Sequence, residues 1–252
     1  QRLLVGRQRR ALRVVDQIQH QATARLAVAQ HIELAPRGNA LVEHAVAALP
    51  VIFAITLHEA AHGYAARHFG DPTAWQQGRI SLNPLRHVDP VGTILIPAAI
   101  LLFSGGSFLF GYAKPVPVDF SRLRNPKKDM FWVAAAGPGA NLFMACCWAL
   151  LLKLAWLMPG NVFTVPLSEM SKIGIIVNCV LMVLNLLPLP PLDGGRIAVS
   201  LLPHKLAWKF AQIERWGFPI LLLLLFTGIL GAVMNPLVIF AARTIETIFG
   251  LY

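Results

Sequence analysis

The composition of this chain excludes an ordinary soluble protein. Of its 252 residues, 56% are hydrophobic and 13% are charged, and the mean hydropathy is +0.60. A soluble domain is about one quarter charged, so this chain lacks the polar residues to cover a soluble particle. The same figures exclude a disordered chain and a collagen, and three cysteines inside apolar runs imply no disulfide scaffold. An integral membrane protein remains, and the position of the charges decides what the net charge of +10 means.

Residues 1–40 form a distinct basic segment. They hold seven Arg against Asp16 and Glu33, which is +5 of the net charge of +10. Apolar residues recur there every three or four positions and predict an amphipathic helix, but no continuous apolar core of a secretory signal is present. Three interpretations stay open for this extension: a helix on the membrane surface, an RNA-binding segment, or a non-native or disordered stretch without function. Residues 41–252 are expected to form one membrane domain.

Hydrophobic runs alternate with short loops after this extension. Each run approaches or exceeds the roughly 20 residues that cross a bilayer. The runs cover residues 41–68, 91–110, 130–157, 172–190 and 216–242. This pattern predicts an all-α polytopic membrane protein with about four to five transmembrane helices.

The first run contains the sequence HEAAH at residues 58–62. On a helix, His58 and His62 lie one turn apart on one face, so both imidazoles can reach one zinc ion. Glu59 can then act as general base toward a water at the metal. Titratable groups inside a membrane cost about 2.5–3.5 kcal/mol each, so three within five residues require a function. The alternative is a solvated stretch at the interface that binds no metal.

A catalytic zinc needs a third protein ligand and an open coordination position. Acidic residues are few after His62, and Asp193 alone among them directly continues an apolar run. Pro188, Pro190 and Pro191 precede it and cannot sustain a helix. Non-helical backbone at membrane depth is tolerated where it is packed in protein or lines a wet cavity. We therefore expect this segment to present the Asp193 carboxylate to the metal, with a simple surface turn as the alternative.

The two motifs together resemble the paired signature of the site-2 protease family, the intramembrane zinc metalloproteases of peptidase family M50. The HExxH motif precedes the form Asn-x-x-Pro-x-Pro-x-Leu-Asp-Gly at residues 185–194, and the sequence GPGAN at residues 137–141 opens the third run. The likeness runs from about residue 41 to residue 215 and is closest to the compact bacterial subgroup without a PDZ or CBS domain.

The resemblance implies one Zn²⁺ per chain and hydrolysis of peptide bonds in transmembrane substrate segments by zinc-activated water. The implied zinc ligands are His58, His62 and Asp193. Glu59 is the implied general base. Asn141 and Asn185 are candidates for a hydrogen bond to the substrate backbone or to the developing oxyanion. For both amides, helix packing or support of the site is the alternative.

The position of the two motifs constrains the topology. His58 lies toward the C-terminal end of the first run, and Asp193 follows the C-terminal end of the fourth. Both reach one metal only if these runs point the same way through the membrane, so one intervening run should not cross. The second run is the better candidate, because the sequence SGGS at residues 104–107 interrupts it. We expect it to be a re-entrant element.

The basic loops then fall mostly on one side of the membrane. The residues on that side are Arg67, Arg79, Arg86, Lys114, Arg122, Arg124, Lys127, Lys128, Arg196, Lys205, Lys209 and Arg215. The other side holds Lys172 and Arg243, apart from the N-terminal extension. The positive-inside rule therefore places the zinc site toward the cytoplasmic face of a bacterial inner membrane. Membrane topology thus accounts for most of the charge of residues 41–252. The seven Arg of the extension conflict with this orientation, so the extension is either non-native, which we prefer, or loops back, and no nucleic-acid partner is expected.

The expected partners are the lipid bilayer and a substrate helix from another membrane protein. A helix hides its backbone in hydrogen bonds, so the substrate must unwind locally before cleavage. Short membrane-associated strands at residues 78–82 and 112–118 are expected to hold the unwound stretch by β-addition. The alternative is that both segments are simple loops.

Other classes of membrane protein stay open on the residues alone. A metal or proton transporter also places His, Glu and Asp inside a bilayer. An inactive homologue that keeps zinc structurally would close the fourth coordination position. A metalloprotease of another type would use a later Glu as third ligand, for which Glu214 and Glu246 are the candidates.

Overall fold

The computed structural model of this chain describes residues 40–103, 113–158, 160 and 162–251. The predicted N-terminal extension, up to residue 39, and the predicted re-entrant tip at residues 104–107 lie outside these residues. The chain divides into two units, residues 1–45 and residues 46–252.

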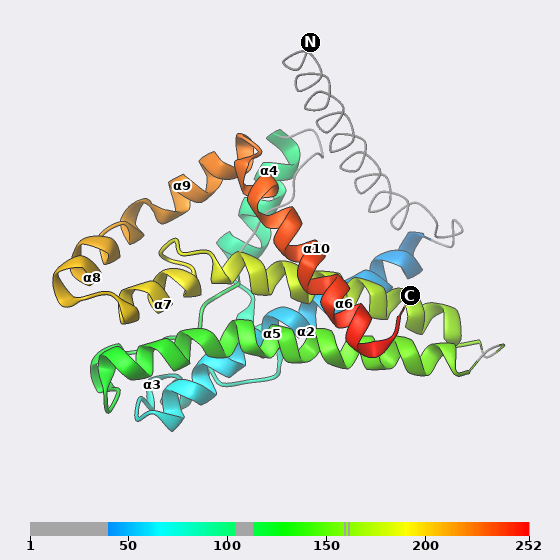
Figure 1. Ribbon diagram of the computed structural model, residues 1–252, viewed down its shortest axis with the longest axis horizontal. Coiled ribbons are helices and arrows are strands. Elements are labelled where there is room, and N and C mark those ends of the chain that lie inside the picture. Colours follow the sequence, from blue (N-terminus) through cyan, green and yellow to red (C-terminus); the bar gives the residue numbers. More distant parts are fainter. Residues whose placement is uncertain (1–39, 104–112, 159, 161, 252) are drawn as a thin grey trace, which may run out of the picture. The chain divides into compact units, whose positions relative to one another are not determined.

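The described part of the chain is helical (Figure 1), which confirms the predicted all-α class. The α-helices are α2 (Ala40–His68), α3 (Thr73–Gln76), α4 (Ile96–Phe103), α5 (Pro126–Trp156), α6 (Thr164–Leu186), α7 (Asp193–Leu201), α8 (His204–Ala211), α9 (Glu214–Phe226) and α10 (Ile229–Phe249). A π-helical turn at Pro90–Leu95 leads into α4, and 3₁₀ turns cover Pro84–His87 and Phe120–Arg122. No strand occurs among the described residues, so the expected strands at 78–82 and 112–118 are not observed there.

Three helices in the described residues are long and apolar enough to cross a membrane: α5, α6 and α10. The fifth hydrophobic run, predicted as one segment at residues 216–242, is divided. Helix α9 ends at Phe226, and Gly228 adopts a left-handed conformation with φ 75° before α10 begins. A glycine reaches this conformation at no steric cost and ends the helix. The continuous fifth helix was therefore a wrong prediction.

Local contacts fix the start of helix α5. Pro126 occupies its first turn, where the missing N–H costs nothing. The carboxylate of Asp129, four residues after Asn125, accepts a hydrogen bond from the backbone N–H of Asn125 at 2.7 Å. This bond also satisfies Asp129, which is buried. The start of the longest helix is thus fixed beside the loop that follows α2.

Helices α2 and α5 pack side by side in opposite directions. His62 of α2 contacts the backbone carbonyl of Val133, and His58, one turn earlier, contacts Asn141 further along α5. The backbone carbonyl of Phe69, just beyond α2, accepts a hydrogen bond from Arg124, just before α5. Residues later in α2 therefore contact residues earlier in α5, so the two helices are antiparallel.

Helices α5 and α6 are also antiparallel. Asn141 is hydrogen-bonded to Asn178, and Trp148, two turns later in α5, faces Gly174, one turn earlier in α6. Because α5 is antiparallel to both neighbours, α2 and α6 run parallel. The relation that the topology argument required between the first and fourth runs is thus present in the structure.

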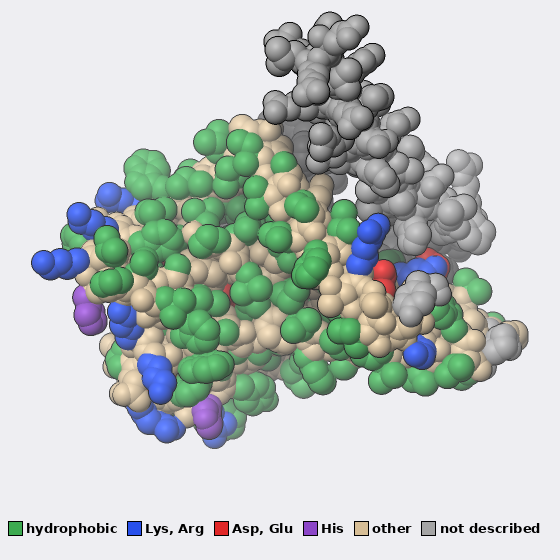
Figure 2. Space-filling view, viewed as in Figure 1, with side chains coloured by type: hydrophobic (Ala, Val, Ile, Leu, Met, Phe, Trp, Pro, Cys, Tyr) green, Lys and Arg blue, Asp and Glu red, His purple; other side chains and the backbone are tan. Residues whose placement is uncertain are grey.

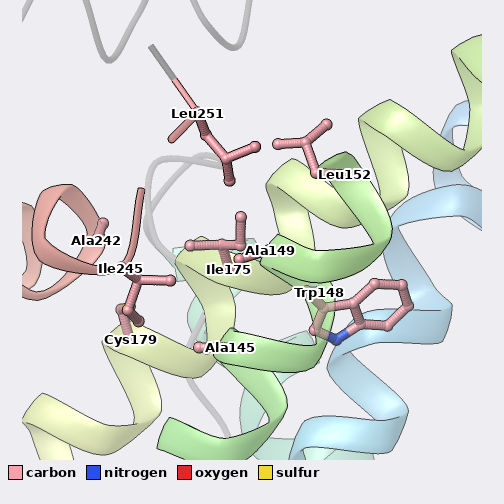
Figure 3. Packing of buried hydrophobic residues seen from close by; sticks show 9 residues of the cluster. All are labelled: Ala145, Trp148, Ala149, Leu152, Ile175, Cys179, Ala242, Ile245 and Leu251. Carbon is pink, nitrogen blue, oxygen red and sulfur yellow. The ribbon is translucent and has the colours of Figure 1, made fainter. Parts of the chain in front are cut away.

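The main hydrophobic core lies where α5, α6 and α10 meet (Figure 3). Its buried members are Ala145, Trp148, Ala149, Leu152, Ile175, Cys179, Ala242, Ile245 and Leu251. Alanines at the contact allow the helix backbones to approach closely, which is how helices associate where lipid is the solvent. A second cluster joins α6, α9 and α10 and comprises Val183, Leu221, Leu230 and Met234. These contacts pack the three candidate spanning helices into one bundle.

Hydrophobic side chains cover much of the outer surface of this bundle. Figure 2 shows apolar residues over most of the visible face, with Lys and Arg gathered at the end that carries α7 and α8. Large side chains such as Leu157, Val162 and Phe240 are 71%, 80% and 72% exposed. An apolar surface of this extent in a chain with spanning helices fits contact with lipid.

Candidate metal centre

Helix α2 places two histidines on its inner face. His58 and His62 are one turn apart, each is 8% exposed, and their Nε2 atoms lie 3.1 Å from each other. The helical spacing that the HEAAH sequence predicts is therefore realised, and both rings point to one place. Glu59, the next residue along the helix, lies partly buried beside them.

Asp193 reaches the same place from the start of α7. Its Oδ2 lies 3.2 Å from the Nε2 of His58 and 3.2 Å from the Nε2 of His62, and the residue is 6% exposed. The chain turns sharply between α6 and α7, as its prolines predict. A Cβ on Gly194 would lie 2.3 Å from the carbonyl oxygens of Leu186 and Leu187, so only glycine allows α7 to start this close to the end of α6.

The three atoms have the spacing of ligands around one zinc ion. Ligands at about 2.0–2.1 Å in a tetrahedral site lie roughly 3.3 Å from one another, close to the 3.1–3.2 Å observed here. His58, His62 and Asp193 are the one group of this kind found among the described residues. A set of three protein ligands leaves the fourth tetrahedral position open, as in catalytic zinc sites.

The hydrogen bonds on the far side of each ring favour a metal at this point. Nδ1 of His62 lies 2.8 Å from the carbonyl oxygen of Val133, which can only accept, so Nδ1 carries the hydrogen. Nδ1 of His58 lies 2.6 Å from Oδ1 of Asn141. Both Nε2 lone pairs then face Asp193 Oδ2, which is buried and accepts no hydrogen bond. Three converging lone pairs favour a cation between them, so the residues fit a zinc ion.

Glu59 is held by the segment that precedes α5. Its Oε2 accepts a hydrogen bond from the backbone N–H of Val116 at 2.8 Å. Val116 lies between Pro115 and Pro117, neither of which has an N–H to offer. The sequence predicted residues 112–118 as a strand for substrate. In the structure, this backbone contacts the predicted general base.

Gly137 of α5 makes room for the two histidines. A Cβ there would lie 2.4 Å from Nε2 of His62 and 2.6 Å from Cε1 of His58. Real side chains do not approach this closely, so any larger residue would displace the rings. The sequence analysis noted Gly137 as part of a motif, whereas the structure gives it a steric function at the centre.

Asn141 and Asn185 differ in their relation to the site. Asn141 is fully buried beside His58, and its Nδ2 donates to the carbonyl of Ala54 at 3.3 Å. Nδ2 of Asn185 donates to the carbonyl of Leu181 at 3.0 Å, one turn earlier in its own helix. The structure therefore brings Asn141 to the predicted metal ligands, while the contact found for Asn185 is local. A hydrogen bond from either to substrate stays a prediction.

One residue near the site was missed by the sequence analysis. Asn178 is fully buried in α6, and its Oδ1 accepts a hydrogen bond from Nδ2 of Asn141 at 3.0 Å. The available signal was a single amide in the middle of the fourth apolar run, since buried amides in membrane helices join neighbouring helices. That signal does not say which helix the amide faces.

Comparison with known proteins decides the family. Residues 157–227 match the model of peptidase family M50. YwhC of Bacillus subtilis, named as a zinc metalloprotease, is 40% identical over 192 residues, which cover 75% of this chain and 84% of YwhC. The chain belongs to peptidase family M50. It is a zinc metalloprotease of the site-2 type, which decides against the transporter interpretation.

Two further relatives share the zinc-metalloprotease name. Rip2 of Mycolicibacterium smegmatis is 32% identical over 177 residues, 70% of this chain and 64% of Rip2. Rip2 of Mycobacterium tuberculosis is 30% identical over 153 residues, 61% of this chain and 54% of Rip2. The chain thus spans less than two thirds of either Rip2 protein. No solved structure matches this M50 protease.

The steric role of Gly137 predicts the effect of a single methyl group. Gly137→Ala should displace the ring of His62, weaken zinc binding at least about tenfold and lower proteolysis in proportion. The measurement is zinc per chain after dialysis of the folded protease in detergent. Gly139→Ala is the matched control, because a Cβ at this position of the same helix would meet nothing within 4 Å. Equal zinc content in the two variants would contradict the assigned role.

Proposed function

We propose that this M50 protease hydrolyses a peptide bond within the transmembrane helix of a substrate protein. The observation that carries the proposal is the buried convergence of His58, His62 and Asp193 beside α5 and α6, two helices able to cross a membrane. Peptide hydrolysis at such a place acts on a chain that is itself in the bilayer. The substrate is therefore a membrane-embedded segment.

The roles of the site residues follow from their contacts. His58, His62 and Asp193 would hold the zinc ion, which supplies Lewis acidity that activates water and polarises the scissile carbonyl. Glu59 takes the proton from the attacking water and later delivers it to the leaving amine. Its Oε2 is held by the N–H of Val116, so Oε1 is the oxygen that exchanges the proton.

The membrane topology we propose has four crossings and one re-entrant element. Helix α2 crosses in addition to α5, α6 and α10, whereas α9 has 13 residues and is too short to span alone. The backbone N–H of Lys114 donates to the carbonyl of His87 at 2.8 Å. His87 and Lys114, which flank the second run, are therefore neighbours, and this supports a re-entrant second run.

The charges support an orientation with the metal centre toward the cytoplasm of a bacterial cell. Lys127, at the start of α5, donates to the carbonyl of Leu202, just after α7. Lys153, near the other end of α5, donates to the carbonyl of Phe249 at the end of α10 at 2.6 Å. The loops at the α7 end carry the larger share of Lys and Arg, and such loops stay in the cytoplasm.

Substrate engagement is proposed at the backbone beside Glu59. Residues 113–118 lack regular structure and lie against α2 through Val116, and an unwound substrate stretch could pair with this backbone by β-addition. Asn185 remains our candidate for a hydrogen bond to substrate. We assign Asn141 to orientation of His58, because its hydrogen-bonding atoms already contact protein groups.

Glu59→Gln tests the proposed chemistry. Glutamine keeps the shape and an acceptor for Val116 but takes up no proton, so cleavage should fall by about 10²–10⁴-fold while zinc remains bound. The assay is cleavage of a labelled single-span substrate in proteoliposomes, with zinc content measured on the same samples. Glu169→Gln serves as control, because Glu169 is an exposed partner of Lys172. Cleavage at the wild-type rate by the Glu59 variant would remove the proposed base.

Cysteine labelling tests the topology. In a background with Cys146, Cys147 and Cys179 replaced by Ala, Ser121→Cys should react with an impermeant maleimide only after the cells are permeabilised. Val162→Cys, in the loop between α5 and α6 and 80% exposed, should react in intact cells. Labelling of residue 121 from outside would rule out the re-entrant arrangement.

A further inference from the structure

We propose that Asn178 of α6 is a positioning residue for the zinc site, which it controls through Asn141 by fixing the tautomer of His58. Asn178 belongs to neither sequence motif, and its hydrogen bonds go to Asn141 and to the backbone of α6. The inference rests on the metal centre proposed above and adds a third helix to the elements that determine its chemistry.

The chain of hydrogen bonds starts at a backbone group with a fixed role. The carbonyl oxygen of Gly174 can only accept, and Nδ2 of Asn178 lies 2.8 Å from it. This bond orients the amide of Asn178, so that its Oδ1 is directed at Nδ2 of Asn141, 3.0 Å away. The backbone of α6 thereby determines which way the first amide points.

The second amide is oriented by two acceptors. Nδ2 of Asn141 faces Oδ1 of Asn178 and also the carbonyl oxygen of Ala54, at 3.3 Å. A reversed amide would place its oxygen against both of these oxygens, which is unfavourable in a buried site. Oδ1 of Asn141 must therefore face Nδ1 of His58, 2.6 Å away.

The tautomer of His58 follows from this arrangement. Nδ1 donates its hydrogen to Oδ1 of Asn141, so Nε2 keeps the lone pair that a metal requires. A reversed Asn141 would offer an N–H to Nδ1 and favour the hydrogen on Nε2, where it blocks a metal bond. His62 needs no such control, because its Nδ1 faces the fixed carbonyl of Val133.

Burial makes this series of hydrogen bonds effective. Asn141 and Asn178 are both 0% exposed, so a group that loses its partner is left unsatisfied. Of the two histidines, only His58 depends on a side chain that could rotate. Asn178 prevents that rotation by holding Asn141, without contacting His58 itself.

The test is the zinc affinity of Asn178 variants, measured by competition with a chromogenic chelator on the full chain in detergent. Asn178→Leu removes both bonds of the amide and should weaken zinc binding about tenfold, the lower end of the range for residues that support metal ligands. Asn178→Asp should bind zinc as the wild type does. A neutral aspartic acid replaces the Nδ2–H with an O–H toward Gly174 and keeps a carbonyl oxygen for Asn141. Asn235→Leu, the same change at an exposed position of α10, is the matched control and should also bind normally.

A double-mutant cycle separates positioning from a general effect on folding. Because Asn178 acts through Asn141, Asn178→Leu should cause no further loss of zinc affinity in an Asn141→Leu background. A cobalt-substituted protein should show the altered metal site as a changed visible spectrum in Asn178→Leu and an unchanged one in Asn178→Asp. Asn178→Ala removes the same bonds without a bulkier side chain and decides the question where the Leu variant fails to fold.

Three results would overturn the inference: wild-type zinc affinity in folded Asn178→Leu or Asn178→Ala, an equal loss from Asn178→Leu with and without Asn141, or no rescue by Asp. Failure of the proposed function is distinguishable from these. A wild-type protein that binds zinc but cleaves no transmembrane substrate would refute intramembrane proteolysis and leave the affinity measurements valid.

Discussion

The structure depends on three electron pairs that converge in a buried part of the molecule. The imidazoles of His58 and His62 and the carboxylate of Asp193 come from two separate helices and meet at 3.1–3.2 Å. Alone they repel one another, and a divalent cation converts the repulsion into binding. The fold must therefore keep α2 and the start of α7 in register, which explains why the chain turns so tightly between α6 and α7.

Helix α5 supplies no ligand and yet controls the centre. It runs antiparallel to both α2 and α6, holds His62 through Val133, and leaves space for the rings at Gly137. Its other end is fixed in the hydrophobic core with α6 and α10. The predicted metal ligands are thus oriented by a helix that is itself packed in the core, as a preorganised site requires.

Sequence reasoning predicts the centre better than its surroundings. The spacing of His58 and His62 and the scarcity of acidic residues were enough to select Asp193, and the structure brings the three together. The contact of Asn178 with Asn141 could not be predicted, because it depends on which faces of α5 and α6 meet. The division of the fifth run depends on the left-handed conformation of Gly228, which hydropathy does not reveal.

The backbone of residues 113–118, which contacts Glu59 through Val116, limits how another strand can pair with it. Between Pro115 and Pro117, Val116 carries the single backbone donor, and Glu59 already occupies it. The carbonyl oxygens of Lys114 and Pro115 already accept hydrogen bonds from Arg79 at 3.1 and 3.3 Å, and an incoming strand would compete with the Glu59 carboxylate for the N–H of Val116. Under the proposed β-addition, arrival of a substrate at this edge and release of Glu59 would be coupled through the hydrogen atom of the Val116 N–H.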